Sequence, residues 1–385
     1  MAVADVISEL TRNAVDVLPE GALERKLSLG RPLRVKLGID VTAPHIHVGN
    51  GIPLQRMRAF QDAGHVGVLI VGDYTTRIGD PSGASVERPI IAPEEIDRMA
   101  ARFFESAYTI LDPERTEVRY NGEWLSKVDF AEVLRLTRMT TVARVLERDD
   151  FAKRFAAQQP ISVSELLYPL MQAYDSVAVE ADVELGGTDQ LYNLLTGRDV
   201  MEAYGLEPQV VLTTPLIESW DGTKMSGSKA NYIALVEDPN EQFGKTMRLP
   251  DKMLAEYYRL VMDQDATPDD PMEAKLALAR FIVERAHGPE AAAAAEEHFR
   301  RVVREHQAPE TVPETTLPNG DPVHLPTLLV EHLGVGSTSE ARRLIAQGGV
   351  KVDGQVVSEI DLPRSRLEGA LVQAGKRRFM RFSGA

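Results

Sequence analysis

A chain of 385 residues, 43% hydrophobic and 26% charged, has the composition of globular domains and is too long for one ordinary core. The absence of cysteine excludes a disulfide framework and a thiolate zinc site. No apolar run is long enough to span a membrane, and the acidic amphipathic N-terminus lacks the basic start of a signal peptide, so we expect a cytoplasmic protein of two or three domains.

The net charge of −15 is unevenly distributed along the chain. From Leu325 to the C-terminus there are nine Lys/Arg and six Asp/Glu, a net charge of +3, whereas the preceding 324 residues carry −18. An acidic body with a basic tail indicates that a polyanionic partner would be bound locally, by the tail.

The first informative stretch predicts a strand, a turn, a helix and a second strand. The apolar run Val35–Ile39 ends in Asp40, the turn carries His47-Val48-Gly49-Asn50, and a segment with helical spacing follows until Gly64. Val66–Val71 is the second apolar run. In such parallel βαβ units, ligands bind beyond the carboxyl ends of the strands, where helix N-termini present N–H groups to anions. On this stretch alone, an ordinary turn that contains a histidine is the stronger alternative.

A glycine-rich loop, residues 72–83, follows the second strand and so faces the same crevice. Its Asp80 could receive a substrate ammonium group, and Arg88 just beyond could meet phosphate. A solvated loop rich in turn residues is an equally good interpretation.

The next signal is a polar stripe on a predicted helix. Tyr168, Gln172 and Asp175 are spaced i, i+4 and i+7, so a helix places the three side chains on one face. Such a face could line a pocket for an amino acid, although a boundary helix with one wet face would show the same pattern.

Two further loops suit a nucleotide. After the predicted strand at Val183–Leu185, the sequence Gly186-Gly187-Thr188-Asp189-Gln190 could let a ribose approach the backbone, with the carboxylate accepting from its hydroxyls. Val210–Leu212 is another buried-strand candidate. Residues 221–229 then hold Lys224, Ser226, Ser228 and Lys229, whose ammonium groups could follow charge onto a leaving pyrophosphate. Taken singly, a plain loop explains each.

Together and in this order, Asp40…HVGN, GDPSG, YxxxQxxD, GGTDQ and KMSGS resemble the class I aminoacyl-tRNA synthetases, and within them the tyrosyl-tRNA synthetases of the bacterial type. The resemblance covers nearly the whole chain. It implies an α/β fold with a Rossmann-type parallel-sheet catalytic domain, an all-α middle domain and a small α+β S4-like RNA-binding domain. It also implies a two-step reaction: tyrosine and ATP give tyrosyl-adenylate and pyrophosphate, and tyrosine then passes to the 3′ end of its tRNA.

The resemblance assigns residues to three groups. The catalytic residues would be His47, Asn50, Lys224, Ser228, Lys229 and Arg88. ATP would lie against Asp40, Thr42, Gly49, Gly187, Asp189, Ile217, Lys224, Met225 and Gly227. Tyrosine would lie against Lys36, Gly38, Asp40, Asp80, Tyr168, Gln172, Asp175 and Gln190. Within this last set, Asp80, Tyr168 and Gln172 would hold the α-ammonium, Gln190 would lie near the carboxylate, and Asp175 would accept from the phenol hydroxyl. Magnesium is expected with ATP, and no structural metal is expected.

Four positions depart from the family pattern. Asn50 replaces the last histidine of the HIGH signature, and an amide still donates. Lys36 stands where many bacterial members carry a second phenol that reads tyrosine, which leaves the hydroxyl without a second known partner. Ala84 and Gly227 stand where lysines are common, although Lys229 follows two places after the second.

The C-terminal part reads as helices followed by a linker and a compact module. The module matches the S4-like RNA-binding domain through SEARRLIAQGGVKVDG, and its helix would lay arginines on RNA phosphates. The expected domains are 1–232 catalytic, 233–308 helical on the anticodon side, 309–324 linker and 325–385 S4-like. The expected tRNA-binding residues are Arg342, Arg343, Gln347, Lys351, Lys376, Arg377 and Arg378.

The prediction is therefore a tyrosine–tRNA ligase with tRNA(Tyr), L-tyrosine and ATP as partners, a homodimer by family resemblance. Two alternatives remain: the tryptophan-specific sister enzyme, and a catalytically weakened paralogue that serves as an RNA-binding protein. YxxxQxxD and the tail argue against the first, while Ala84 and Gly227 motivate the second.

Overall fold

The computed structural model describes residues 3–40, 46–80, 92–225, 230–301, 312–375 and 378–383. The chain divides into two compact units, Met1–Gly288 and Pro289–Ala385. Each is described separately below, and the predicted division of the first unit near residue 232 stays a prediction. None of the helices that the structure describes is long and apolar enough to cross a membrane.

The first unit is built on a six-stranded sheet with the order β1-β6-β5-β2-β3-β4. All neighbouring strands are parallel except β1, which pairs antiparallel with β6. The strands are β1 (Asp16–Leu18), β2 (Arg34–Ile39), β3 (Val66–Val71), β4 (Thr116–Tyr120), β5 (Val183–Gly187) and β6 (Val210–Thr214). The chain leaves β2 toward β3 and β4, while β5 and β6 lie on its other side. The junction of β2 and β5 is therefore a topological switch point, where sheets of this kind bind ligands. The predicted Rossmann-type α/β class is confirmed.

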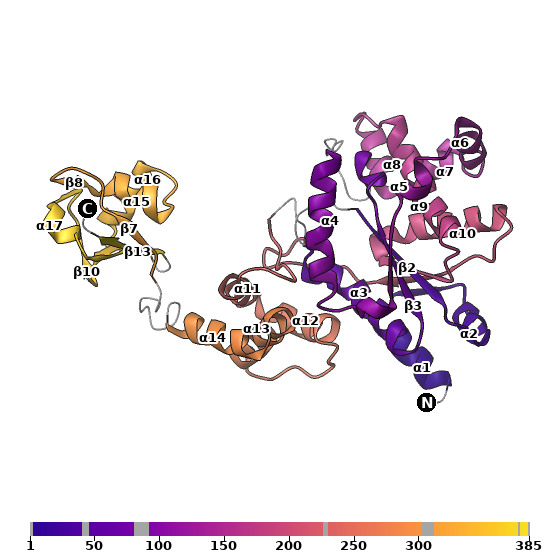
Figure 1. The fold of residues 1–385 in the computed structure, drawn as a ribbon, viewed down its shortest axis with the longest axis horizontal. Helices are drawn as coiled ribbons and strands as arrows, with labels where there is room; N and C mark the ends of the chain where they lie inside the picture. The colour runs from indigo at the N-terminus through magenta and orange to yellow at the C-terminus, as the bar shows by residue number, and fades with distance from the viewer. Residues whose placement is uncertain are drawn as a thin grey trace. The chain divides into compact units, whose positions relative to one another are not determined.

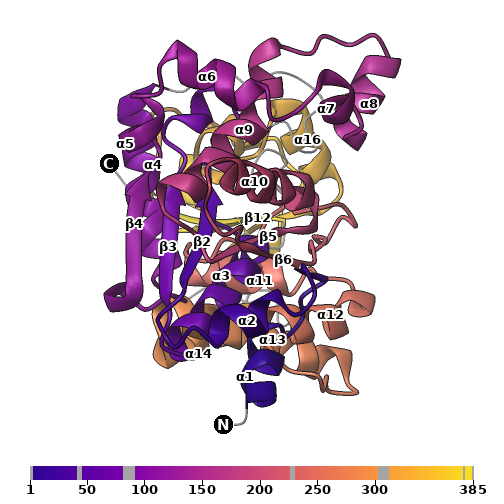
Figure 2. The same ribbon diagram turned by 90° about the vertical axis from the view of Figure 1, so that its right-hand side faces the viewer.

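Helices cover both faces of this sheet. Residues that alternate along β2 point to opposite faces, so Val35 and Leu37 join the core beneath α3 (Val48–Asp62), whereas Lys36 faces α9 (Val163–Ala178). Figure 1 shows α3 and α4 (Pro93–Ala107) on one side of the strands, with α9 and α10 (Leu191–Ala203) on the other. In Figure 2, α9 and α10 lie in front of the strands.

Short helices fill the connections of the first unit, and a helical segment completes it. The short elements are α1 (Val3–Leu10), α2 (Ala22–Leu27), η1 (Thr75–Arg77), η2 (Pro113–Arg115), η3 (Thr188–Gln190), α5 (Gly122–Leu125), α6 (Phe130–Thr137), α7 (Val142–Leu146) and α8 (Asp149–Ala156). The segment after β6 holds α11 (Pro239–Thr246), η5 (Asp251–Met253), α12 (Leu254–Val261) and α13 (Pro271–His287). Buried side chains of α12 and α13 join the same apolar core as the sheet.

The second unit opens with α14 (Pro289–Phe299) and has its own core of buried apolar residues. A five-stranded sheet has the order β10-β9-β12-β13-β7, and β11 pairs with β8. The elements are β7 (Glu314–Thr316), β8 (Val323–His324), α15 (Leu325–Leu333), α16 (Thr338–Ala346), β9 (Val350–Val352), β10 (Gln355–Val356), β11 (Asp361–Leu362), α17 (Arg364–Leu367), β12 (Leu371–Ala374) and β13 (Arg378–Ser383). The segment 309–324, predicted as a linker, thus contributes two strands to this unit.

Two local features shape helix α16 and the β9–β10 hairpin of the second unit. Ser337 caps α16 and accepts a hydrogen bond from the N–H of Glu340 at 3.1 Å. Asp353 and Gly354 have φ of 46° and 79°, the left-handed conformation that a tight two-residue hairpin between β9 and β10 requires.

Candidate active site

An open space lies over Gly38, near the carboxyl end of the central strand β2. Gly38 is exposed although it pairs with Ile70 of β3, and a Cβ built on it would meet nothing within 4 Å. Side chains two residues apart share a face of a strand, so Lys36, Gly38 and Asp40 face the same side as α9. A flat molecule could therefore lie on the strand at this point, between the predicted residues that surround it.

Asp40, directly after β2, ties three elements together at this space. Its carboxylate accepts from the hydroxyl of Tyr168 on α9 at 2.9 Å and from Thr75 on η1 at 2.7 Å. Gly72 is required here, because a Cβ on it would lie 2.1 Å from the Asp40 carboxylate. Burial and the nearby carboxylates of Asp40 and Asp80 raise the pKa of Tyr168 well above its ordinary value, so the phenol stays a donor.

Asp175 is buried on α9 and is held by two neutral donors. The indole Nε1 of Trp124 donates to one carboxylate oxygen at 2.8 Å, and Asn121 donates to the other at 3.3 Å. Burial raises the pKa of Asp175 to about 7, against the opposing effects of the Lys36 charge and these two donors. An ordinary buried carboxylate would be paired with a cation, so one held only by neutral groups is poised to take a further donor.

Lys36 is fully buried and forms a tight ion pair. Its ammonium donates to Glu184 on β5 at 2.8 Å, to Ser176 at 2.7 Å and to the backbone oxygen of Gln172 at 2.9 Å. An ammonium has three N–H groups, and these three acceptors use them all. Lys36 therefore joins β2, β5 and α9 behind the open space and presents no donor to a ligand there.

Asp80 and Gln190, two of the residues expected to bind tyrosine, come from different loops and contact each other at the site. The side-chain amide of Gln190, at the end of η3, donates to Asp80 at 2.7 Å. Asp80 comes from the loop after η1 and Gln190 from the loop after β5, so the sheet topology brings them together.

His47 and Asn50 form a reciprocal cap at the start of α3. The ring Nδ1 of His47 accepts from the backbone N–H of Asn50, and the Asn50 side chain accepts from the backbone N–H of His47, both at 3.3 Å. With Nδ1 as the acceptor, Nε2 carries the proton and is a donor. Burial, together with the charge of Lys224, lowers the pKa of His47 to about 4, so the ring is neutral at physiological pH.

The loop that carries Lys224 is anchored against the same helix start. Ile217 and Met225 are buried and joined by a backbone hydrogen bond of 3.2 Å, and a Cβ on Gly49 would lie 3.1 Å from Ile217. Lys224 pairs with Asp189 at 2.6 Å. A Cβ on Gly187 would lie 2.6 Å from the Asp189 carboxylate, so only glycine leaves that carboxylate in place.

Some predicted site residues lie outside the described residues. These are Thr42, Arg88, Gly227, Ser228, Lys229, Lys376 and Arg377. Ala84, one of the four positions that depart from the family pattern, lies outside them as well. In the second unit, Arg342, Arg343 and Gln347 are exposed on α16 or directly after it, Lys351 is half-buried on β9, and Arg378 is exposed on β13.

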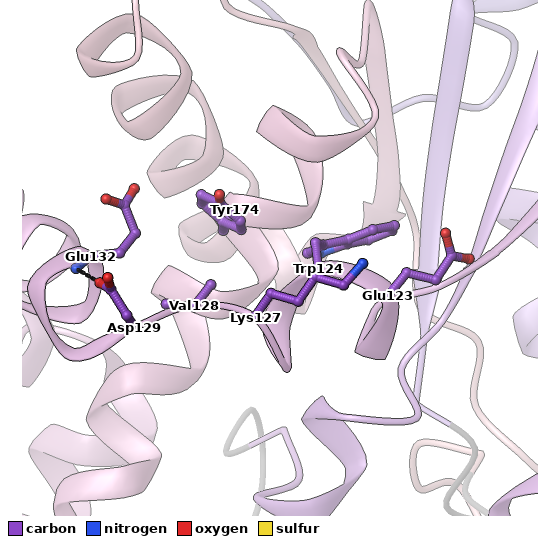
Figure 3. Close-up of a pocket in the computed structure, with 7 residues that line it drawn as sticks. All are labelled: Glu123, Trp124, Lys127, Val128, Asp129, Glu132 and Tyr174. Atoms are coloured by element: carbon purple, nitrogen blue, oxygen red, sulfur yellow. Dashed lines mark hydrogen bonds between the residues drawn. The ribbon is translucent and has the colours of Figure 1, made fainter.

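A separate open pocket of about 390 Å³ contains none of the predicted ligand-binding residues. It is lined by Glu123, Trp124, Lys127, Val128, Asp129, Glu132 and Tyr174 (Figure 3). Trp124 lines it while its Nε1 donates to Asp175, so one indole contributes to both regions.

Sequence reasoning missed the side chains that hold the site residues. Thr75 fixes Asp40, Asn121 and Trp124 fix Asp175, and Glu184 pairs with Lys36. The one available signal was position: Asn121 follows β4 directly, at the same carboxyl edge of the sheet as the other loops.

Known proteins share the sequence and the fold of this chain. The model of the family "tRNA synthetases class I (W and Y)" matches residues 28–304, and that of the "S4 domain" matches residues 325–361. The chain is 48% identical to the tyrosine–tRNA ligase of Moorella thermoacetica, over 98% of this chain and 96% of that protein. It is 45% identical to the tyrosine–tRNA ligase of Thermotoga maritima, over 100% and 98%.

Solved structures with similar folds are more distant in sequence. A tyrosyl-tRNA synthetase from Archaeoglobus fulgidus, complexed with L-tyrosine, superposes with a TM-score of 0.61 at 23% identity, over 76% of this chain and 100% of that one. A C-terminally truncated mitochondrial tyrosyl-tRNA synthetase from Coccidioides posadasii gives a TM-score of 0.61 at 22% identity, over 76% and 90%. At these identities the likeness concerns the fold.

Proposed function

Because this chain belongs to the tyrosine–tRNA ligases of the class I tRNA synthetase family, we propose that the space over Gly38 binds L-tyrosine for activation by ATP. A carboxylate oxygen of tyrosine attacks the α-phosphate, the bond to pyrophosphate breaks, and tyrosyl-adenylate forms. The terminal hydroxyl of tRNA(Tyr) then attacks the activated carbonyl, and AMP leaves. The observation that carries this proposal is Asp175, a buried carboxylate that accepts hydrogen bonds from two neutral donors, on the helix that packs over the Gly38 face of β2.

On the amino-acid side, Asp175 accepts the phenol O–H. Asp80, Tyr168 and Gln172 hold the α-ammonium, whose positive charge is complementary to the carboxylate of Asp80. Gln190 lies near the substrate carboxylate. Asp40 supports this arrangement by fixing the Tyr168 hydroxyl. Lys36 does not contact the amino acid directly, because its N–H groups donate to Glu184 and to α9. It supports the site by joining these elements.

On the ATP side, His47 donates from Nε2 to the phosphates as a neutral ring, and the side-chain NH₂ of Asn50 adds a further donor. Gly49, Ile217 and Met225 form the surface beneath the nucleotide, and Gly187 and Asp189 receive the ribose. Thr42, Arg88, Gly227, Ser228 and Lys229 keep the roles at the phosphates that the family resemblance implies. Lys224 must exchange Asp189 for phosphate, and an exposed ion pair worth about 0–1 kcal/mol allows that exchange.

Magnesium would arrive with ATP. Among the residues that the structure describes, no three His, Cys, Asp or Glu side chains gather closely enough to hold a metal ion. Phosphate oxygens are the usual ligands of Mg²⁺ at such sites, and the ion would supply charge neutralisation for the leaving pyrophosphate. We also propose a cytoplasmic location, because the second substrate is tRNA.

The second unit is proposed to hold tRNA without taking part in activation. Arg342 and Arg343 lie exposed on α16 of a module that has its own core, and none of the activation residues lies within it. Gln347, Lys351, Lys376, Arg377 and Arg378 would extend the same contact to the RNA backbone.

A paired measurement of pyrophosphate exchange and tRNA charging tests both proposals. Exchange of pyrophosphate with ATP is expected to require tyrosine and to be inactive with tryptophan. Replacing both Arg342 and Arg343 by alanine should leave exchange unchanged, weaken tRNA binding about tenfold, and reduce the slope of log affinity against log salt by about 1 to 2. Arg366→Ala, an exposed arginine of the same unit outside α16, is the matched control.

The outcomes separate the alternatives. Exchange with tryptophan instead of tyrosine would identify the sister enzyme, and RNA binding without any exchange would identify a weakened paralogue. Equal charging by the parent and the double variant would remove the role of α16.

A homodimer is proposed from exposed apolar residues that the first unit carries on neighbouring segments. Phe130, Val142, Phe155 and Val163, on α6 to α9, have exposed fractions between 65% and 76%. Monomers rarely expose large apolar patches. Phe155→Asp is expected to halve the mass measured by light scattering. Leu29 is another exposed apolar residue, distant from these four in the sequence, and Leu29→Asp should leave the mass unchanged. A parent protein that is already monomeric at micromolar concentration would contradict this.

A further inference from the structure

Four polar side chains form a continuous hydrogen-bonded chain that ends at the amino-acid site. Arg148 Nη1 donates to Asn193 Oδ1 at 2.9 Å, and Asn193 Nδ2 donates to Gln190 Oε1 at 3.0 Å. Gln190 Nε2 then donates to Asp80 Oδ2 at 2.7 Å. The hydrogen-bonded chain starts at Arg148, the residue directly before α8, passes through α10 and reaches the loop after η1.

The chemistry of the two ends determines the orientation of the two amides. A guanidinium can only donate hydrogen bonds, and an ionised carboxylate can only accept them. Asn193 must therefore turn its oxygen to Arg148 and its NH₂ to Gln190. Gln190 must in turn present its oxygen to Asn193 and its NH₂ to Asp80. Reversing either amide would place two donors or two acceptors against each other.

The donor end is rigidly held. Asp150 accepts from Nε and Nη2 of Arg148 at 3.1 and 2.9 Å, which leaves Nη1 directed at Asn193. The guanidinium carbon lies 5.1 Å from the ring centroid of Phe151 and 5.3 Å from that of Tyr192. Arg148 is 8% exposed and Asn193 only 1% exposed. A buried charge with this many contacts fixes geometry more firmly than a surface arginine would.

We propose that Arg148 and Asn193 are positioning residues that make Gln190 a hydrogen-bond donor toward the carboxylate of the bound amino acid. An amide nitrogen has two N–H groups, and Asp80 takes one, so the second can serve the substrate. With the amide reversed, its oxygen would face two anions, Asp80 and the substrate carboxylate. This inference rests on the proposed function, since it assumes that Gln190 lies near that carboxylate.

Binding of two ligands that differ only in the carboxylate tests the proposal. L-tyrosine and tyramine share the phenol and the ammonium, but tyramine lacks the carboxylate. Asn193→Leu keeps the branched shape of the side chain and removes both of its hydrogen bonds. It is expected to raise the Kd of tyrosine about tenfold while the Kd of tyramine changes less than about twofold. A purely structural defect would weaken both ligands equally, and that result would overturn the proposal.

A second pair of variants keeps the test valid if Asn193→Leu folds poorly. Arg148→Lys keeps a group that only donates, so the preference for tyrosine over tyramine should be largely retained. Arg148→Met cannot donate, and the preference should fall as in Asn193→Leu. Equal preferences in these two variants would overturn the relay while leaving the proposed function in place. A parent protein that binds tyramine as tightly as tyrosine would instead overturn the assignment of Gln190, and the relay with it.

Discussion

Replacing Asp175 by alanine is expected to abolish most of the discrimination between tyrosine and phenylalanine. In the parent, phenylalanine would leave a buried carboxylate without the phenol donor, and such a loss is costly. Tyrosine-specific ligases are themselves the established example of this effect, with discrimination on the order of 10⁵ against phenylalanine. In Asp175→Ala the hydroxyl loses its acceptor, so kcat/KM for tyrosine should fall by about 10²-fold or more, whereas phenylalanine should lose little. The measurement is pyrophosphate exchange with each amino acid.

The same carboxyl predicts a pH dependence of specificity. Its pKa is raised to about 7, so the group takes a proton as pH falls through that value. A phenol donates best to the ionised form, and tyrosine affinity should therefore decrease below pH 7, by up to about tenfold per pH unit. Phenylalanine gains nothing from ionised Asp175, so the ratio of the two affinities should be larger at pH 8 than at pH 6. His47, with a pKa of about 4, stays neutral across this range.

Asp175→Asn is the control for both effects. It keeps the volume and removes the titrating group, so its tyrosine affinity should not change between pH 6 and 8. Parent protein that activates the two amino acids equally would show that Asp175 does not read the hydroxyl. A specificity that changes with pH in Asp175→Asn would assign the titration to another group.

Sequence patterns predicted the architecture well because each decisive signal was local. The apolar runs at 35–39, 66–71 and 183–185 became β2, β3 and β5, and the i, i+4, i+7 spacing placed Tyr168, Gln172 and Asp175 on one helix. A short apolar run between two polar turns favours a buried strand. The carboxyl ends of neighbouring parallel strands then lie at the same edge of the sheet. The convergence of these loops was therefore predictable before any distance was known.

The partners of the site residues could not be predicted, because they depend on contacts between distant segments. Asp175 meets Asn121 and Trp124, which lie more than fifty residues earlier in the chain. The partner of Lys36 was unpredictable for the same reason. A lysine at this position indicated a departure from the family pattern, yet the Glu184 that pairs with it lies 148 residues away. Nothing in the local sequence distinguishes a lysine that contacts a ligand from one buried in an ion pair.

Replacing Lys224 by alanine is expected to slow adenylate formation by about 10²- to 10³-fold with little change in tyrosine affinity. Negative charge accumulates on pyrophosphate as the bond to the α-phosphate breaks, so a cation at this loop stabilises the transition state more than the ground state. Lys224 is free to move to that position, because its side chain is 52% exposed and its present partner, Asp189, is itself accessible. Its charge already acts on His47, whose pKa it lowers, so the two residues share one electrostatic environment.

Single-turnover measurement of tyrosyl-adenylate formation separates the rate from the affinity. Tyrosine Kd should stay within about twofold of the parent value in Lys224→Ala, because the lysine lies beside Asp189, which we propose to bind the nucleotide, rather than beside Asp175. Lys252→Ala, at an exposed lysine of η5, should leave both quantities unchanged. A Lys224→Ala variant that loses tyrosine affinity in proportion to rate would mean that the residue supports ground-state binding. A variant that keeps the parental rate would mean that another cation meets the leaving pyrophosphate, and Lys229→Ala would then identify whether that cation is the lysine two positions beyond Gly227.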